Sequence, residues 1–134
     1  MRIIGGKMKG SSLFIPLNKN TRPLKDLARE SIFNLLAHSK KISFELKKSN
    51  ILDLYAGTGS FGLECISRGA QNVSFVEKEK EAIKILKKNI EKLNVKKVSN
   101  IYPVEILNFI KKNNNQKFDL IFFDPPFRVN NIKN

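Results

Sequence analysis

The sequence of 134 residues contains one cysteine and one histidine, so it is poor in side chains that build disulfides and many metal centres, and it contains no tryptophan. A lone Cys65 excludes an internal disulfide and any metal site made of several cysteines. We interpret Cys65 as a packed core thiol, because it falls inside a predicted helix. His38 ends another predicted helix and is interpreted as a surface residue. The sequence predicts a reduced protein that holds no metal.

Long apolar runs are also missing from the chain. No segment approaches the length of a membrane span, and the N-terminus lacks the apolar core of a signal peptide. We therefore expect a cytoplasmic protein with no membrane partner. A chain of 134 residues is long enough for one domain with a real core but short for a complete doubly wound α/β fold.

Acidic residues are scarce, with 12 Asp and Glu against 25 Lys and Arg, and the net charge is +13. Such a charge favours a polyanionic partner, above all nucleic acid, although a codon bias toward lysine would also scatter positive charge. Residues 1–48 carry 11 basic and 3 acidic residues, a net +8, and the remainder carries +5. The N-terminal third is therefore the better candidate for an RNA-facing surface.

A glycine-rich stretch at residues 50–62 organises the rest of the chain. Its apolar run is typical of a buried parallel strand. Gly57, Gly59 and Gly62 follow with the G-x-G-x-x-G spacing, which allows a tight turn, close approach of a ligand to the backbone, and packing of a helix on the strand. The same spacing also serves dinucleotides, so it does not identify the ligand.

Strand and helix patterns alternate from Asn50 onward, which predicts parallel βαβ units. The expected strands end at about residue 55 and span residues 73–76, 98–102 and 118–123, and the expected helices span residues 60–67, 79–93 and 104–112. Before them, glycine-linked short strands in residues 2–15 predict a basic hairpin. A helix is expected over residues 24–37, with Ala28, Ile32 and Leu36 on one stripe. We divide the chain into an N-terminal extension, residues 1–48, and a core, residues 49–134.

Three acidic residues narrow the ligand of the glycine loop. Glu77 ends the second strand about 20 residues after the first glycine, where an acid can bind both ribose hydroxyls; a solvated charge is the alternative. Asp53, within the first strand, favours the ammonium and sulfonium of S-adenosylmethionine over a pyrophosphate. Glu105 either accepts a hydrogen bond from an adenine amine or is an acid favoured at a helix start.

The second motif is Asp124-Pro125-Pro126-Phe127, directly after an apolar strand. Two prolines make a stiff loop that fixes its neighbours. An exocyclic base amine is a poor nucleophile while its lone pair is conjugated with the ring. A carboxylate and a backbone carbonyl that hold both amine hydrogens favour the tetrahedral geometry that attacks a methyl group, and a phenylalanine can stack on the base. A stiff surface turn is the alternative.

Together these residues resemble the class I S-adenosylmethionine-dependent methyltransferases of the amino-group type, which carry an (Asp/Asn)-Pro-Pro-(Tyr/Phe) loop. More narrowly, the chain resembles the RsmD-type enzymes, which methylate N2 of a guanine in bacterial 16S ribosomal RNA. This resemblance spans nearly the whole chain and rests on Arg2-Ile3-Ile4-Gly5-Gly6, Arg22-Pro23, Arg29-Glu30, Phe33-Asn34, Leu52 to Gly59, and Asp124 to Phe127.

The resemblance implies a Rossmann-like α/β sheet, mostly parallel with strand order 3-2-1-4, preceded by an N-terminal β-hairpin and helix. The family continues beyond this point with further strands. We therefore expect a core that is incomplete at its C-terminal side, with the fourth strand as an apolar sheet edge.

The resemblance also implies roles for individual residues. The implied cofactor-binding residues are Asp53, Tyr55, Ala56, Gly57, Thr58 and Gly59 for the methionine part of S-adenosylmethionine, Glu77 for the ribose and Glu105 for the adenine. The implied catalytic residues are Asp124, the Pro125 carbonyl and the stacking Phe127. The implied RNA contacts are Arg2, Lys7, Lys9 and Arg22, toward 16S ribosomal RNA or the assembling 30S subunit, and a monomer is expected.

Three alternatives stay open. The acceptor amine could be another one, such as N6 of adenine in DNA or a protein glutamine, although Asp124 is less common than asparagine in those enzymes. The chain could be a truncated, inactive RNA-binding remnant, which its charge and length favour. A dinucleotide oxidoreductase would offer no role for the double-proline loop.

Overall fold

The computed structural model describes residues 1–16, 23–38, 45–113 and 115–125, without the side chains of residues 23–27. Its centre is a parallel sheet with the strand order β3-β2-β1-β4. The strands are β1 Asn50–Leu54, β2 Asn72–Val76, β3 Ser99–Tyr102 and β4 Leu120–Phe123. Fold class and strand order are therefore as predicted.

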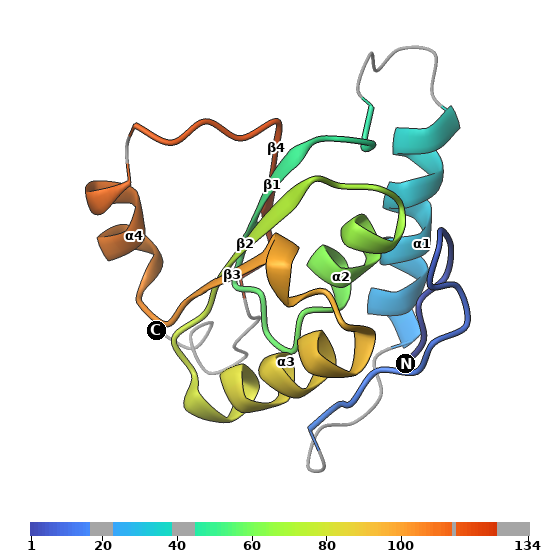
Figure 1. Ribbon diagram of the computed structural model, residues 1–134, viewed down its shortest axis with the longest axis horizontal. Helices are drawn as coiled ribbons and strands as arrows, with labels where there is room; N and C mark the ends of the chain where they lie inside the picture. The colour runs from blue at the N-terminus through green and yellow to red at the C-terminus, as the bar shows by residue number, and fades with distance from the viewer. Residues whose placement is uncertain (17–22, 39–44, 114, 126–134) are drawn as a thin grey trace, which may run out of the picture.

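Helices connect the strands and cover both faces of the sheet. They are α1 Pro23–His38, α2 Ser60–Ser67, α3 Lys80–Leu93 and α4 Ile106–Lys112, with a 3₁₀ turn at Lys96–Val98. Figure 1 shows α1, α2 and α3 on one side of the sheet and α4 on the other. Within the described ranges, no helix combines the length and the apolar character that a membrane crossing requires.

Alternating side chains of the strands feed two cores, as the two-residue period of a strand requires. On the face of α1 to α3, Ile51, Val73 and Phe75 are fully buried with side chains of these helices and of the N-terminal segment. On the face of α4, a smaller core contains Leu52, Leu54, Val76 and Phe109. The middle of the sheet is thus covered on both faces.

The N-terminal segment, residues 1–16, turns back on itself as predicted, but the two expected strands are reduced to one antiparallel bridge between Arg2 and Ser12. Backbone hydrogen bonds still join its two arms, from the Ile3 N–H to the Ser11 carbonyl and from the Leu13 N–H to the Met1 carbonyl, but the backbone between them bonds to α2. The Ile4 and Gly5 N–H groups each donate to the Glu64 carboxylate over 2.9 Å. At Gly6, a Cβ would lie 2.1 Å from the Ser67 carbonyl oxygen, so only glycine allows this close docking.

Helix α1 packs through only part of the predicted stripe: Ile32 and Leu36 are partly buried against the main core, as expected. Phe33 and Arg29 are its buried residues with described side chains, whereas Ala28 is exposed and Leu35 is 54% exposed. The Phe33 ring stacks on Phe61 with 5.1 Å between centroids, and the guanidinium carbon of Arg68 lies 4.6 Å from the centroid of the Phe33 ring. Phe61 lies on α2 and Arg68 is the C-cap residue of α2, so contacts with this helix favour the burial of Phe33.

Candidate active site

The two loops singled out by the sequence leave the sheet at the same edge. Strands β1 and β4 are parallel neighbours, with Leu54 opposite Phe123. The glycine loop begins directly after Leu54, and Asp124 directly follows Phe123. The ring of Tyr55 meets that of Phe123 edge-on, with 5.4 Å between centroids. The structure therefore brings the start of the glycine loop beside the start of the Asp-Pro loop, which is where open α/β sheets place ligands.

The glycine loop is held in a left-handed conformation at three points, with φ of 58° at Tyr55, 59° at Gly57 and 94° at Gly59. At Gly59 a Cβ would lie 2.4 Å from Leu86 Cδ1, so this glycine packs against α3. At Gly57 a Cβ would meet no atom within 4 Å. The space above Gly57 is therefore open to a ligand, while Gly59 serves the packing of the loop.

Asp53 of β1 is hydrogen-bonded to the first turn of α2. It is 1% exposed, and its Oδ2 accepts a hydrogen bond from the Gly62 N–H over 3.2 Å. Its negative charge faces the positive end of the helix dipole, which is a favourable position for a carboxylate. Gly62 lets α2 approach the sheet, since a Cβ there would lie 2.3 Å from Phe75 Cε1.

Glu77 ties the glycine loop to the start of α3. Its Oε1 accepts from the Gly57 N–H over 2.8 Å, and its Oε2 accepts from the N–H groups of Lys78 and Glu79 over 3.1 and 2.9 Å. An ionised carboxylate offers about four lone-pair positions. Glu77 therefore keeps acceptor capacity at the end of β2 for a further hydroxyl donor.

Glu105 lies just beyond β3 as the N-cap residue of α4. Its side chain is exposed, and Oε1 is 3.9 Å from the Lys78 Nζ. A carboxylate at this position complements the helix dipole, in agreement with the second of the two interpretations. The proposed contact with adenine stays a prediction.

Asp124, which is predicted to hold the acceptor amine, is half-buried and is followed by the exposed Pro125. The strand that carries them is anchored by Phe122, whose ring stacks on Phe61 with 3.8 Å between centroids and 8° between planes. Phe127 lies outside the described residues, and so does Arg22, so their roles stay predictions.

Three of the predicted RNA contacts lie on the surface of the N-terminal segment. Arg2, Lys7 and Lys9 are all exposed. Arg2 also donates from Nη1 to the Gly10 carbonyl over 3.1 Å, which holds the turn of the segment together. Their charged ends are therefore available to a polyanion, and the contact itself stays a prediction.

Sequence reasoning missed the buried polar side chains beside the glycine loop. Asn89 is 0% exposed, and its Nδ2 donates to the Thr58 carbonyl over 2.9 Å and to the Phe14 carbonyl over 3.2 Å. Glu64, also 0% exposed, pairs with the Arg68 guanidinium over 2.8 Å. An asparagine on the apolar stripe of α3 and an i, i+4 charge pair on α2 were the available signals.

Cys65 is fully buried, as predicted. Burial raises the pKa of its thiol well above the ordinary value, and the nearby carboxylates of Asp53 and Glu64 raise it further, against a lowering effect of Arg68. A thiol that resists ionisation is a poor nucleophile. Cys65 is therefore a packing residue.

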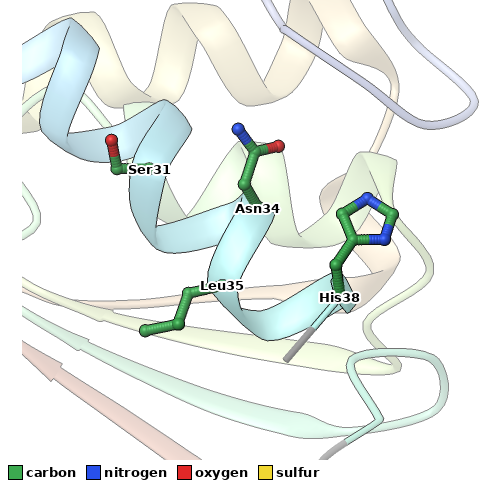
Figure 2. Close-up of a pocket in the computed structure, with 4 residues that line it drawn as sticks. All are labelled: Ser31, Asn34, Leu35 and His38. Atoms are coloured by element: carbon green, nitrogen blue, oxygen red, sulfur yellow. The ribbon is translucent and has the colours of Figure 1, made fainter. Parts of the chain in front are cut away.

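A surface hollow on α1 is lined by Ser31, Asn34, Leu35 and His38 (Figure 2). All of these come from one helix, and His38 is the exposed last residue of that helix, as the sequence indicated. None of the predicted site residues lines this hollow, so it has no part in the site.

Comparison with known proteins places the whole chain in one family. The family model described as conserved hypothetical protein 95 matches residues 1–134. The protein "Ribosomal RNA small subunit methyltransferase D" of Buchnera aphidicola subsp. Baizongia pistaciae is 37% identical over 99% of this chain and 64% of its own length. The protein of the same name from Haemophilus influenzae is 36% identical over 97% of this chain and 65% of its own length.

A solved structure agrees with these relatives. The Escherichia coli protein yhhF superposes with a TM-score of 0.75 at 30% identity, covering 96% of this chain and 65% of that one. The chain thus spans 64 to 65% of the length of these three proteins. It belongs to the family described as conserved hypothetical protein 95, as the resemblance to the RsmD-type enzymes predicted, and has the class I methyltransferase fold.

Proposed function

We propose that this protein transfers a methyl group from S-adenosylmethionine to an exocyclic amine of an RNA base, namely N2 of a guanine in 16S ribosomal RNA. The observation that carries the proposal is the shared sheet edge, where the glycine loop after β1 lies beside Asp124 after β4. The names of the Buchnera and Haemophilus relatives support ribosomal RNA of the small subunit as the substrate.

The residues of the glycine loop fit an adenosine-type cofactor. The open position above Gly57 leaves room for a ligand, and Glu77 keeps acceptor capacity for ribose hydroxyls. The buried charge of Asp53 favours a cationic group close to the loop. When bound, S-adenosylmethionine supplies an electrophilic methyl group on a sulfonium. Tyr55, Ala56, Thr58, Gly59 and, for the adenine, Glu105 complete the proposed cofactor-binding set.

On the acceptor side, Asp124 and the Pro125 carbonyl oxygen hold the two hydrogens of the guanine amine. This contact draws the lone pair out of conjugation with the ring and points it at the methyl group. The carboxylate also stabilises the positive charge that develops on the nitrogen as the new bond forms, and it can then accept the surplus proton. Phe127 stacks on the base and keeps the amine in place.

The N-terminal extension, residues 1–48, contributes the RNA contacts. Arg2, Lys7 and Lys9 are exposed on it, and Arg22 belongs to the same basic stretch. Each such residue would neutralise a phosphate, which gives affinity without sequence selection. Choice of the target guanine would then depend on the core, residues 49–134, and on the shape of the 16S RNA or assembling 30S subunit, which a monomer would bind.

The test supplies S-adenosylmethionine with a labelled methyl group and 30S particles that lack the modification, then digests the RNA to nucleosides. We expect the label in N2-methylguanosine. Label in adenosine or in protein would show that the methyl acceptor is an adenine or protein amine and not the guanine N2 proposed here. RNA binding with a steep salt dependence but no cofactor binding would instead favour the RNA-binding remnant, which the net charge of +13 supports.

A further inference from the structure

Two buried side chains from different helices join the N-terminal segment to the glycine loop. Asn89 of α3 bonds to the carbonyl of Thr58, and Arg29 of α1 bonds to the carbonyl of Ser60. These two carbonyls flank Gly59, whose φ of 94° sets the direction of the loop. Each side chain also holds a carbonyl of the N-terminal segment.

On the α3 side, the amide of Asn89 uses all its available groups. Nδ2 donates to Thr58 over 2.9 Å and to the Phe14 carbonyl over 3.2 Å, while Oδ1 accepts from the Phe14 N–H over 2.7 Å. Asn89 is 0% exposed, so water cannot replace these bonds. Movement of residue 14 therefore either moves the loop at Thr58 or leaves a buried polar group unpaired.

On the α1 side, the guanidinium of Arg29 also reaches both the N-terminal segment and the loop, while its buried Nε has no hydrogen-bond partner among the described residues. Nη2 donates to the Arg2 carbonyl over 2.9 Å, and Nη1 reaches the Ser60 carbonyl over 3.5 Å. Arg29 is 7% exposed, and a buried cation depends on such partners. The two ends of the N-terminal segment are thus each bonded to one side of Gly59.

The remaining buried bonds of this segment lead elsewhere. Ser67 of α2 donates from Oγ to the Gly5 carbonyl over 2.7 Å and accepts from the Met8 N–H over 2.8 Å. Ser67 is the last residue of α2, at the opposite end of that helix from the glycine loop. It offers an attachment of the segment that does not touch the loop.

We propose that Asn89 and Arg29 are positioning residues that couple RNA binding on the N-terminal segment to cofactor binding on the glycine loop. The inference rests on the proposed function, since it takes Arg2, Lys7 and Lys9 as RNA contacts. RNA that holds the segment against the loop already orders the loop. The loop then loses less conformational entropy when the cofactor binds. Each ligand therefore tightens the other by the same factor.

The experiment measures the dissociation constant of S-adenosylhomocysteine, which cannot donate a methyl group, with and without saturating unmodified 16S RNA transcript. For the unsubstituted protein we expect the RNA to tighten binding at least about fivefold. Asn89→Asp keeps the acceptor for Phe14 but removes the donor to both carbonyls, and we expect the RNA effect to fall below about twofold. Arg29→Lys, which cannot reach both carbonyls, repeats the test from the other helix.

Ser67→Ala is the matched control, because it also removes buried bonds of the N-terminal segment. The quantity compared is the ratio of the dissociation constants of S-adenosylhomocysteine without and with RNA. A merely structural role would lower stability and both affinities in all variants and leave this ratio unchanged. Loss of the ratio in Asn89→Asp or Arg29→Lys, with its retention in Ser67→Ala, supports the proposal. An unsubstituted protein that binds both ligands independently would overturn it and leave the proposed function intact, whereas absence of S-adenosylhomocysteine binding would overturn both.

Discussion

The two middle strands and β4 differ sharply in burial, although they belong to one sheet. In β1 and β2, every residue after the first is buried. In β4, burial alternates, and Ile121 and Phe123 are 56% and 59% exposed. The register pairs Leu52, which is 4% exposed, with Ile121 on the neighbouring strand. On the same face of the sheet, a side chain of β1 is therefore buried while its partner on the neighbouring β4 is exposed to solvent.

This difference separates the two halves of the proposed site. The cofactor half is the glycine loop that follows β1, a strand with a neighbour on each side. Hydrogen bonds of Glu77, Asn89 and Asp53 hold this loop and the start of α2. The acceptor half, Asp124, rises from β4 at the outer side of the described sheet, where the stack of Phe122 on Phe61 holds one face. We conclude that, in the described part of the chain, the strand beneath the cofactor half is covered on both faces, whereas the strand that carries Asp124 is exposed on one face.

The largest expected effect compares register partners. Leu52→Ala removes a buried side chain and leaves a cavity, so we expect a loss of about 2–5 kcal/mol in the free energy of unfolding. Ile121→Ala removes the same kind of side chain from solvent, and a loss below about 0.5 kcal/mol is expected. Urea denaturation of the two variants measures both values. Equal losses would show that Ile121 is as well packed as its partner.

The next effect falls on the acceptor half. Asp124→Ala should lower the rate of methyl transfer by about 10²–10³-fold, the effect of removing one preorganised polar group. Affinity for S-adenosylhomocysteine should stay within about twofold, because the cofactor half does not depend on this side chain. A single-turnover assay with calorimetry separates the two quantities. A large loss of cofactor affinity would mean that the halves are not independent.

A smaller effect is expected at Gly57, where a Cβ meets open space. Gly57→Ala should cost about 1–2 kcal/mol of stability through its left-handed φ of 59°. Gly10→Ala is the matched control, since Gly10 has a φ of 88° and equally open surroundings. Only Gly57→Ala should weaken cofactor binding, by about tenfold. Equal cofactor affinities in the two variants would remove Gly57 from the proposed site.

The smallest effect concerns the charged segment. Lys7→Ala should weaken RNA binding by a few-fold and lower the slope of log K against log salt by about one. Lys97→Ala, an exposed lysine of the 3₁₀ turn, is the control and should change neither. Filter binding over a salt series measures both. The same change in both variants would mean that RNA affinity depends on the net charge of the protein and not on the position of Lys7.

Local patterns in the sequence predicted the sheet and α2 well. The bounds of α2, Ser60–Ser67, agree with those expected from the glycine loop before it and Gly69 after it, which has a φ of 107°. Strand order and the common edge of the two loops followed from the family resemblance and from right-handed crossovers. The bounds of the strands and of α2 depend on periodicity and turn residues, which are local, whereas the strand order does not.

Contacts between distant segments could not be predicted in this way. Glu64 binds the backbone of Ile4, which lies 60 positions away, and Asn89 binds Phe14 across 75 positions. The i, i+4 spacing of Glu64 and Arg68 indicates an ion pair, but no local pattern shows that the glutamate will be buried, because its other partners are backbone donors of a distant segment. The same reason explains α1, where Phe33 packs on an aromatic side chain of α2, so that Phe33 is buried and Ala28 of the predicted stripe is exposed, while Ile32 and Leu36 still contact the core.

The most direct test of the central claim is a crystal structure of the complex with S-adenosylhomocysteine. The account predicts that the sulfur lies above Gly57 and faces Asp124, with room for one base amine between them. A ligand seated elsewhere, or an Asp124 carboxylate that no single amine could bridge to the sulfur, would contradict it.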